Sequence, residues 1–339
     1  MIPDAIFERT LMEFFAPIKS LLEDQSVSEV MINGSKDIRI EKCGRIEKTE
    51  AAFESDFTLE AALRNLAQYT GRKLDASSPI LEGRLPDGSR VEALIPPVAP
   101  DGPQVSIRRF SKSVLSMSSL VEKSTLTKEA ADFLRRAVAG KKNVIVAGGT
   151  GSGKTSFLNA LSGFIPEGAR IVTIEDAREL NLQHDHVVAL EARPCTATNG
   201  NPISVRDLFR ASLRMRPDRV VVGEIRGGEA LDLLQAMTSG HGGCLSTLHA
   251  TYPRDVLSRL ETMALMSDVE LPLDALRSQI GSAVDLIVLV ARFDDGTRCV
   301  THITRVDEYQ LGKGYTMEDV FSRYEGDLVC KRQGGKGKA

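Results

Sequence analysis

The pattern with the clearest chemistry is a glycine-rich run, Gly148-Gly149-Thr150-Gly151-Ser152-Gly153-Lys154-Thr155. It matches the phosphate-loop pattern GxxxxGK[ST] at every fixed position, between an apolar run at 143–147 and a predicted helix at 154–162. Glycines let backbone N–H groups turn toward a phosphate, and the amino end of a helix favours negative charge. We therefore predict a nucleotide site in which Lys154 reaches the β- and γ-phosphates and Thr155 ligates Mg²⁺. The residues expected to bind the nucleotide are Gly149, Thr150, Gly151, Ser152, Gly153, Lys154, Thr155 and Ser156.

Acidic residues end two further apolar runs. Glu224 follows the run at 220–223, and Glu175-Asp176 follows the run at 170–174. Ligands of open α/β sheets bind outside the carboxyl ends of the strands, so we expect these acids beside the phosphates. Glu224 has the reach of a general base that activates the attacking water. The alternatives are a salt-bridged strand end for Glu224 and a helix cap for the Glu175-Asp176 pair.

Two histidines, His241 and His249, bracket a short apolar run at 244–248. No cysteine pair or carboxylate stands at zinc-ligand spacing beside them, so the sequence does not indicate a zinc site. A neutral imidazole at a strand end can instead sense a γ-phosphate or donate a hydrogen bond across a subunit boundary. We expect this role for both, with a purely structural role as the alternative.

Arginines of the first third of the chain could also meet a phosphate. Arg90, Arg108 and Arg109 lie on predicted strands. An arginine beside a transferring phosphoryl group stabilises its developing charge. On spacing alone they could equally be surface arginines paired with acids such as Glu82 and Glu92.

The elements that must position these residues fall into two groups. Residues 4–24 have helical spacing with a break at Pro17, and short alternating runs follow around Asn33-Gly34. A helix at 58–69 and strands within 80–110 complete a predicted small antiparallel sheet with helices on it.

From residue 126 onward, apolar strands alternate with helices. Continuous apolar strands separated by helices predict a parallel sheet that is covered on both faces. We predict an N-terminal α+β domain over 1–110, a serine-rich linker over 111–125, a P-loop domain over 126–325 and a disordered tail over 326–339.

Composition excludes several other classes of protein. The 339 residues are 42% hydrophobic and 26% charged with a net charge of −3, which is typical of a globular protein without a basic field. The sequence shows no apolar run of transmembrane length and no signal-peptide pattern near its start. Its 5 cysteines form no CxxC pair, which argues against a disulfide framework and for a cytoplasmic location.

Four motifs in order carry a family resemblance: GGTGSGKT, TIEDAREL, MRPDRVVVGEIRGGEA and TSGHGGCLSTLHA. They resemble the Walker A, Asp-box, Walker B and His-box segments of the traffic ATPases of type II and type IV secretion. The similarity covers about residues 25–325, since LPDGSRVEALIPPVAPDGPQVSIRRF also resembles the family's N-terminal strands. Within the family the chain most resembles the tight-adherence (CpaF/TadA-type) pilus assembly ATPases, with conjugation (TrbB-like) ATPases second. The absence of a four-cysteine zinc segment argues against the type II secretion and pilus extension branches.

The resemblance implies a RecA-like P-loop ATPase domain with a smaller α+β, PAS-like N-terminal domain. It implies a homohexamer that uses ATP and Mg²⁺ to power pilus assembly or secretion through an inner-membrane platform protein. The protein would then be cytoplasmic and peripherally associated with the inner membrane, with no transmembrane segment.

The resemblance also implies roles by motif. Glu224 activates water, Glu175 helps to position Mg²⁺ or water, and the two histidines sense the nucleotide state. The implied catalytic set is Glu224, Glu175, Lys154, His241, His249, Arg90 and Arg108, and the implied Mg²⁺ ligands are Thr155, Glu175 and Glu224.

Three alternative functions remain open at this point. One is a conjugative type IV secretion ATPase, and another is a scaffold ring that binds ATP but hydrolyses it weakly. A nucleic-acid motor is the third, although the balanced charge and 5% aromatic content argue against a strand-binding groove. No nucleic-acid partner is therefore expected.

Overall fold

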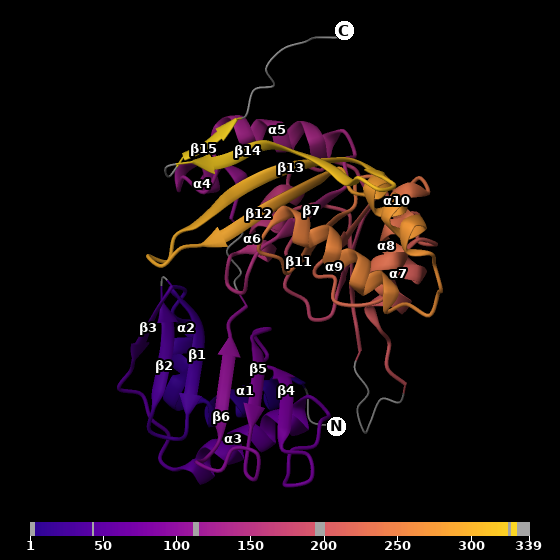
Figure 1. Cartoon of the computed structure of the whole chain (residues 1–339). Helices are drawn as coiled ribbons and strands as arrows, with labels where there is room; N and C mark the ends of the chain where they lie inside the picture. The colour runs from indigo at the N-terminus through magenta and orange to yellow at the C-terminus, as the bar shows by residue number, and fades with distance from the viewer. Residues whose placement is uncertain (1–3, 43, 111–114, 194–200, 325–326, 331–339) are drawn as a thin grey trace. The chain divides into compact units, whose positions relative to one another are not determined.

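The computed structural model describes residues 4–42, 44–110, 115–193, 201–324 and 327–330 (Figure 1). The chain divides into two compact units, one formed by residues 1–113 with 195–202 and one formed by residues 114–194 with 203–339. Among the described residues, none of the helices combines the length and apolar character needed to cross a bilayer.

The first unit is built on a six-stranded sheet in the order β3-β2-β1-β6-β5-β4, with every neighbouring pair antiparallel. Its strands are β1 (Val27–Asn33), β2 (Ile38–Lys42), β3 (Arg45–Lys48), β4 (Ile80–Arg84), β5 (Arg90–Leu94) and β6 (Gln104–Arg108). Its helices are α1 (Asp4–Phe14), η1 (Ala16–Ile18), α2 (Lys19–Glu23) and α3 (Asp56–Tyr69). The predicted helix over 4–24 is interrupted at η1, where Pro17 supplies no N–H to the helical ladder.

One face of this sheet forms the core of the first unit. Leu11 of α1 and Leu63 of α3 are buried in the same cluster as Val30 of β1 and Val91 of β5. The opposite face carries polar and charged side chains because residues alternate along each strand. This arrangement confirms the predicted α+β architecture.

The second unit is built on a nine-stranded sheet in the order β15-β14-β13-β12-β7-β11-β10-β8-β9. The six strands from β12 to β9 in this order are parallel, and β13, β14 and β15 add antiparallel pairs at one side. The strands are β7 (Val144–Ala147), β8 (Ile171–Glu175), β9 (Val187–Glu191), β10 (Arg219–Val222), β11 (Leu245–Leu248), β12 (Leu286–Arg292), β13 (Arg298–Gln310), β14 (Gly314–Tyr324) and β15 (Asp327–Cys330).

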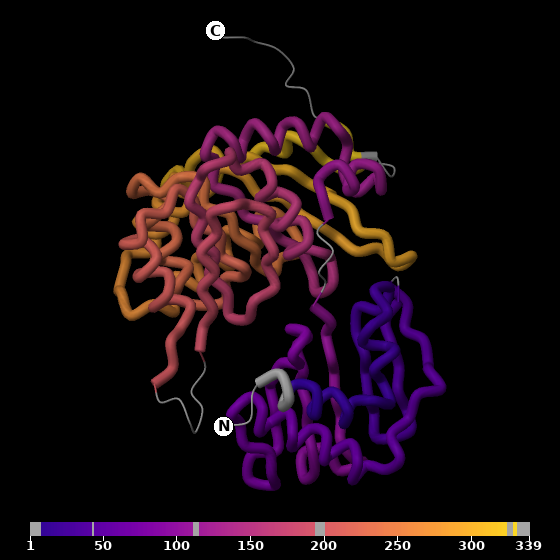
Figure 2. The backbone as a smooth tube through the Cα atoms, turned by 180° about the vertical axis from the view of Figure 1, so that it is seen from behind, coloured from indigo at the N-terminus to yellow at the C-terminus, as the bar shows by residue number. Residues whose placement is uncertain are grey.

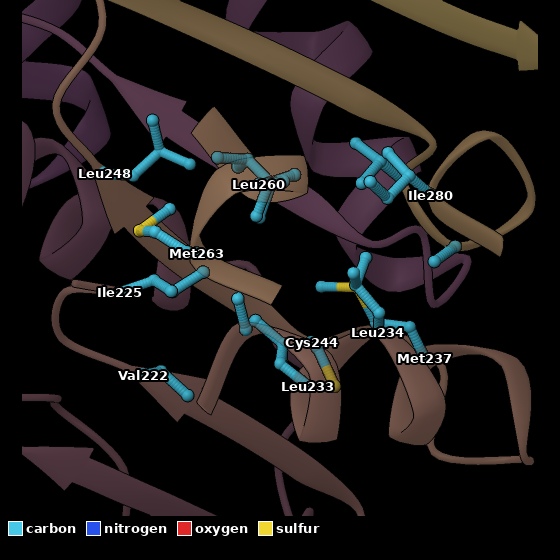
Figure 3. Close-up of a cluster of buried hydrophobic side chains, with 14 of the residues drawn as sticks. Val222, Ile225, Leu233, Leu234, Met237, Cys244, Leu248, Leu260, Met263 and Ile280 are labelled. Carbon is cyan, nitrogen blue, oxygen red and sulfur yellow. The ribbon is translucent and has the colours of Figure 1, made fainter. Parts of the chain in front are cut away.

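Helices cover both faces of this sheet (Figures 1 and 2). One face packs against α4 (Met117–Glu122), α5 (Lys128–Ala139) and α6 (Lys154–Ser162), and the other against α7 (Val205–Ser212), α8 (Glu229–Thr238), α9 (Pro253–Leu265) and α10 (Leu273–Ala283). Figure 3 shows part of the core between the sheet and α7–α10, where Val222 and Leu248 of the sheet cluster with Leu234, Leu260 and Ile280 of the helices. The fold is the predicted two-face α/β arrangement.

Short elements form within the segments predicted as a linker and as a tail. Within the predicted linker over 111–125, residues 117–122 form α4, whose Met117 and Leu120 are buried in the second unit. Within the predicted tail, Asp327–Cys330 form β15, which pairs with β14 and buries Leu328. Neither α4 nor β15 was predicted as an element, because each is short and has only one or two buried apolar residues. Residues 111–114, 326 and 331–339 of these predictions lie outside the described residues.

Candidate functional site

The phosphate loop connects β7 to α6, as the sequence predicts. Gly151 and Gly153 adopt φ values of 70° and 91°, which side-chain-bearing residues rarely adopt. At Gly148 an added Cβ would lie 2.2 Å from the carbonyl oxygen of Val290, so the strand beside the loop leaves room only for glycine. The glycines therefore fix the loop's path, and they leave residues 149–151 exposed next to the amino end of α6.

Lys154 lies folded over this loop. It is 8% exposed, and its Nζ donates to the carbonyl oxygen of Gly149 at 3.0 Å. The same Nζ lies 3.4 Å from Nδ1 of His249. The ammonium group is therefore held at the mouth of the loop, where the phosphate-loop pattern requires it.

His249 and Glu224 meet at the same edge of the sheet. The strands β7, β11 and β10 are parallel neighbours, and each of these residues follows the carboxyl end of its strand. His249 Nε2 lies 2.7 Å from Glu224 Oε1. Burial and the positive charge of Lys154 lower the pKa of His249, and they outweigh the opposing effect of Glu224. A neutral imidazole can then accept from Lys154 at Nδ1 and donate to Glu224 from Nε2.

The second oxygen of Glu224 binds Arg226, a residue that the sequence analysis did not predict. Arg226 Nε donates to Glu224 Oε2 at 2.5 Å, and its Nη1 lies 3.4 Å from Oδ2 of Asp176. Arg226 thereby links the two strand-end acids that the sequence placed at this edge. Its position in the loop just after Glu224 was the one available signal.

Glu175 is buried at the end of β8. It is 4% exposed, and its Oε1 accepts from the backbone N–H groups of Glu179 and Leu180, both at 2.8 Å. Burial raises the pKa of Glu175 to about 7. A Cβ on Gly223 would lie 2.9 Å from Cγ of Glu175, so a side chain at position 223, just after β10, would clash with Glu175. Within the chain Glu175 therefore holds the backbone at Glu179 and Leu180, and its role in positioning Mg²⁺ or water stays a prediction.

That loop presents a different acid to the phosphate loop. Thr155 Oγ1 donates to Oε2 of Glu179 at 3.3 Å. Mg²⁺ prefers hydroxyl, carboxylate and phosphate oxygens, and it usually keeps several waters. Thr155 and Glu179 fit that preference, with Glu224 on the neighbouring strand end. The described residues contain no group of three or more His, Cys, Asp and Glu side chains able to hold a metal ion.

His241 does not join this site within one chain. It precedes β11, whereas His249 follows it, so the two histidines lie at opposite edges of the sheet. The backbone carbonyl oxygen of His241 accepts from Cys244 Sγ at 3.1 Å, and the backbone N–H of His241 donates to the carbonyl oxygen of Ala236 at 3.2 Å. Both contacts shape the turn between α8 and β11, and a role in nucleotide sensing stays a prediction.

In the first unit, Arg90 and Arg108 face each other across β5 and β6. Arg84, which the sequence analysis did not single out, is opposite Arg90 across β4 and β5. Directly opposed residues share a face of a sheet, so these arginines form a row on the side away from the core. Arg109 instead donates from Nη1 to the carbonyl oxygen of Val27 at 2.8 Å, a contact within the fold.

Comparison with known proteins shows which family has this sequence pattern. A family model described as "Type II/IV secretion system protein" matches residues 12–338. The chain is 35% identical over 297 residues to the type IV secretion system protein PtlH of Bordetella pertussis, covering 80% of this chain and 87% of that protein. It is 32% identical over 293 residues to the conjugal transfer protein TrbB of Rhizobium radiobacter, covering 85% of this chain and 86% of that one.

A solved structure shares the fold. The ATPase DotB of Legionella pneumophila superimposes with a TM-score of 0.60 at 21% identity, covering 85% of this chain and 79% of DotB. The two relatives above are named for type IV secretion and conjugal transfer, not for tight-adherence pilus assembly. With its phosphate loop and general-base candidate at one sheet edge, the chain belongs to the type II/IV secretion system protein family and is a P-loop ATP hydrolase.

Proposed function

We propose that the protein is the ATPase of a type IV secretion machine of the conjugation class, and that it works as a homohexameric ring. The similarity to TrbB and PtlH over at least 80% of the chain supports this class. It favours the conjugation alternative over the tight-adherence pilus motor to which the motifs first pointed. In either machine the ring would act on an inner-membrane partner from the cytoplasmic side.

The observation that supports ATP hydrolysis at this site is the contact between Glu224 and His249 beside Lys154. An arriving γ-phosphate would attract Lys154 away from the carbonyl oxygen of Gly149, because a dianionic group binds an ammonium more strongly than a carbonyl does. His249 would lose a contact to Lys154 and keep its donation to Glu224, so its orientation would report whether a γ-phosphate is present.

Hydrolysis would then proceed with Glu224 as general base. Its carboxylate accepts a proton from the water that attacks the γ-phosphorus, and the products are ADP and inorganic phosphate. Lys154 neutralises charge on the transferring group, and Thr155 with Glu179 would hold Mg²⁺. When bound, Mg²⁺ neutralises charge that develops on the β- and γ-phosphate oxygens.

The arginine row is the proposed contribution of a neighbouring subunit. We propose that Arg90 and Arg108 contact the phosphates of a nucleotide bound to the next chain. A mixed-ring experiment tests this. Arg90→Ala and Glu224→Gln should each abolish most phosphate release alone, and mixing the two proteins should restore part of it. Some mixed sites would combine an intact arginine with an intact Glu224.

Two controls make the mixed-ring result interpretable. A mixture of Arg90→Ala with Arg108→Ala should restore nothing, since every site would still lack one arginine. If mixing Arg90→Ala with Glu224→Gln also restores nothing while both proteins form hexamers by light scattering, the shared-site proposal is wrong.

A separate experiment tests the class of machine. In the cell that carries the gene, Glu224→Gln should abolish transfer of a mobilisable plasmid or secretion of the machine's substrate while surface pili of the tight-adherence type remain. The reverse outcome, intact transfer and lost pili, would favour the pilus motor. Loss of neither would contradict both functions.

A further inference from the structure

The hairpin between β12 and β13 brings two arginines to the phosphate loop. Arg292 ends β12, Arg298 begins β13, and the two residues are directly paired. Opposed residues of an antiparallel pair share a face, so both guanidinium groups leave the hairpin on the same side. The turn between them is fixed by Phe293 N–H donating to the Thr297 carbonyl oxygen at 2.9 Å and by Thr297 Oγ1 donating to Asp295 Oδ1 at 2.6 Å.

Both arginines lie against the glycines of the loop. Arg298 Nε donates to the carbonyl oxygen of Gly151 at 2.9 Å. Its Cδ lies 3.2 Å from where a Cβ on Gly153 would be, and Arg292 Nη1 lies 3.3 Å from the corresponding position on Gly151. Lys154, the cation that the phosphate-loop pattern requires, contacts a different part of the loop at Gly149.

The hairpin carries two arginines and two aspartates and so has no net charge, and it is the placement of its arginines that suits an anionic ligand. Arg292 and Arg298 are exposed on a segment that the phosphate-loop pattern does not include. The Asp295 carboxylate of the same turn accepts from Thr297, and this contact lowers its pKa. Two guanidinium groups therefore stand beside the loop segment whose N–H groups cradle the α- and β-phosphates in this pattern.

We propose that the hairpin is a second phosphate clamp, in which Arg292 and Arg298 bind the α- and β-phosphate oxygens of a nucleoside di- or triphosphate. The inference rests on the nucleotide site proposed above. Guanidinium groups bind phosphate oxygens through short, charge-assisted hydrogen bonds. Arg298 also positions the loop through its bond to Gly151. ATP and ADP share the α- and β-phosphates, so the clamp strengthens binding of both and contributes little to the chemical step.

Binding measurements with two glutamine variants test the clamp. We expect Arg298→Gln and Arg292→Gln each to weaken ATP and ADP binding by about tenfold, the scale of one hydrogen bond to a charged group. KM for ATP should rise by a similar factor while kcat changes less than about twofold, which is the signature of lost ground-state binding. Inorganic tripolyphosphate should lose affinity by the same factor as ADP, because the clamp contacts phosphate and not the base.

Arg305→Gln is a matched control on the same strand. Arg305 pairs with Asp307 and Glu318 at a distance along β13 from the loop, so this variant should bind ATP like wild type. Unchanged ATP and ADP affinity in Arg298→Gln would overturn the clamp, as would weaker ADP binding with unchanged tripolyphosphate binding. A fall in kcat with unchanged affinities would overturn it too, since that pattern marks a transition-state contact. If the wild-type protein bound neither nucleotide, the proposed function itself would be contradicted.

Discussion

The two edges of the nine-stranded sheet use polar residues in different ways. At the carboxyl edge of the strands, the side chains of His249, Glu224 and Arg226 bond to one another, and Lys154 Nζ lies 3.4 Å from His249. At the amino edge, the buried side chain of Asn143 binds the backbone. Asn143 donates to the Ala283 carbonyl oxygen and accepts from the N–H groups of Gly243 and Cys244.

The type of hydrogen-bond partner separates side chains that can bind a ligand or take part in chemistry from side chains that stabilise the fold. A side chain bonded to another side chain can exchange that partner for a ligand without disturbing the sheet. A side chain bonded to strand-end amides cannot, because a buried amide left without a partner costs about 1–3 kcal/mol. We therefore expect changes to His249, Glu224 and Lys154 to affect chemistry, and a change at Asn143 to affect stability.

The largest expected effect is that of Lys154→Ala. Removing the ammonium group from the mouth of the loop should lower ATP turnover by about a hundredfold or more, because the phosphates lose their nearest cation. Melting temperature should stay within about 2 °C of wild type, since Lys154 is bonded to a loop carbonyl and not to a strand. Lys142→Ala, a lysine of the amino edge that pairs with Asp285, is the control and should leave turnover unchanged. Equal turnover in both variants would contradict the phosphate-loop assignment.

Asn143→Ala should give the opposite result. It leaves the N–H groups of Gly243 and Cys244 and the carbonyl oxygen of Ala283 without their partner. The free energy of unfolding of the second unit should fall by about 3 kcal/mol, measured by denaturant titration. Turnover per folded molecule should match wild type at low temperature. Reduced turnover of Asn143→Ala with an unchanged free energy of unfolding would contradict a purely structural role for Asn143.

The third effect concerns His249. His249→Ala should lower kcat by about tenfold, because Glu224 loses the donor that orients it. His249→Gln should restore part of the rate, since an amide can also donate to Glu224. The folded protein binds the His249 proton less readily than the unfolded chain does, so protonation of this residue reduces stability as pH falls below the ordinary value of 6.5. Between pH 7 and pH 5.5 the melting temperature of wild type should therefore fall more than that of the glutamine variant. Equal falls would show that protonation of His249 is not the cause.

The smallest effect is expected from Glu175→Gln. The folded-state pKa of about 7 lies above the ordinary value of 4.5, so the folded protein holds this proton more tightly, and stability falls as pH rises between those values. Glutamine keeps an oxygen for the two backbone amides and carries no charge. The variant should show a flatter fall in melting temperature from pH 5 to pH 7.5, with turnover within about threefold of wild type. A loss of turnover as large as that of Lys154→Ala would instead support the predicted catalytic role of Glu175.

Much of this site could be predicted because the relevant residues follow directly after apolar strands. Lys154, Glu224 and His249 each stand at the carboxyl end of a strand or its loop, and parallel neighbours bring those ends together. His241 precedes β11 and His249 follows it, so the direction of this strand places the two histidines at opposite edges of the sheet. Strand direction would have separated the two histidines, although the same role was predicted for both.

Other contacts could not be predicted from spacing. The direction of the Glu175 side chain depends on which face its strand end presents, and β8 is buried on both faces. Glu179 and Arg226 reach the site through loops whose path no periodicity fixes, and Arg298 reaches it from a hairpin far along the chain. In the fold, β14 escaped prediction because its run of mixed polar and apolar residues lacks the clear pattern of the parallel strands.

The most direct test of the account is to measure ATP binding and phosphate release of Glu224→Gln in the same preparation. Glutamine keeps the size of the side chain and an oxygen for His249 but cannot accept the proton of the attacking water. The account predicts wild-type ATP affinity with phosphate release reduced by about 10²–10⁴-fold, the range for a lost general base. Phosphate release within about threefold of wild type by a folded Glu224→Gln protein would contradict it.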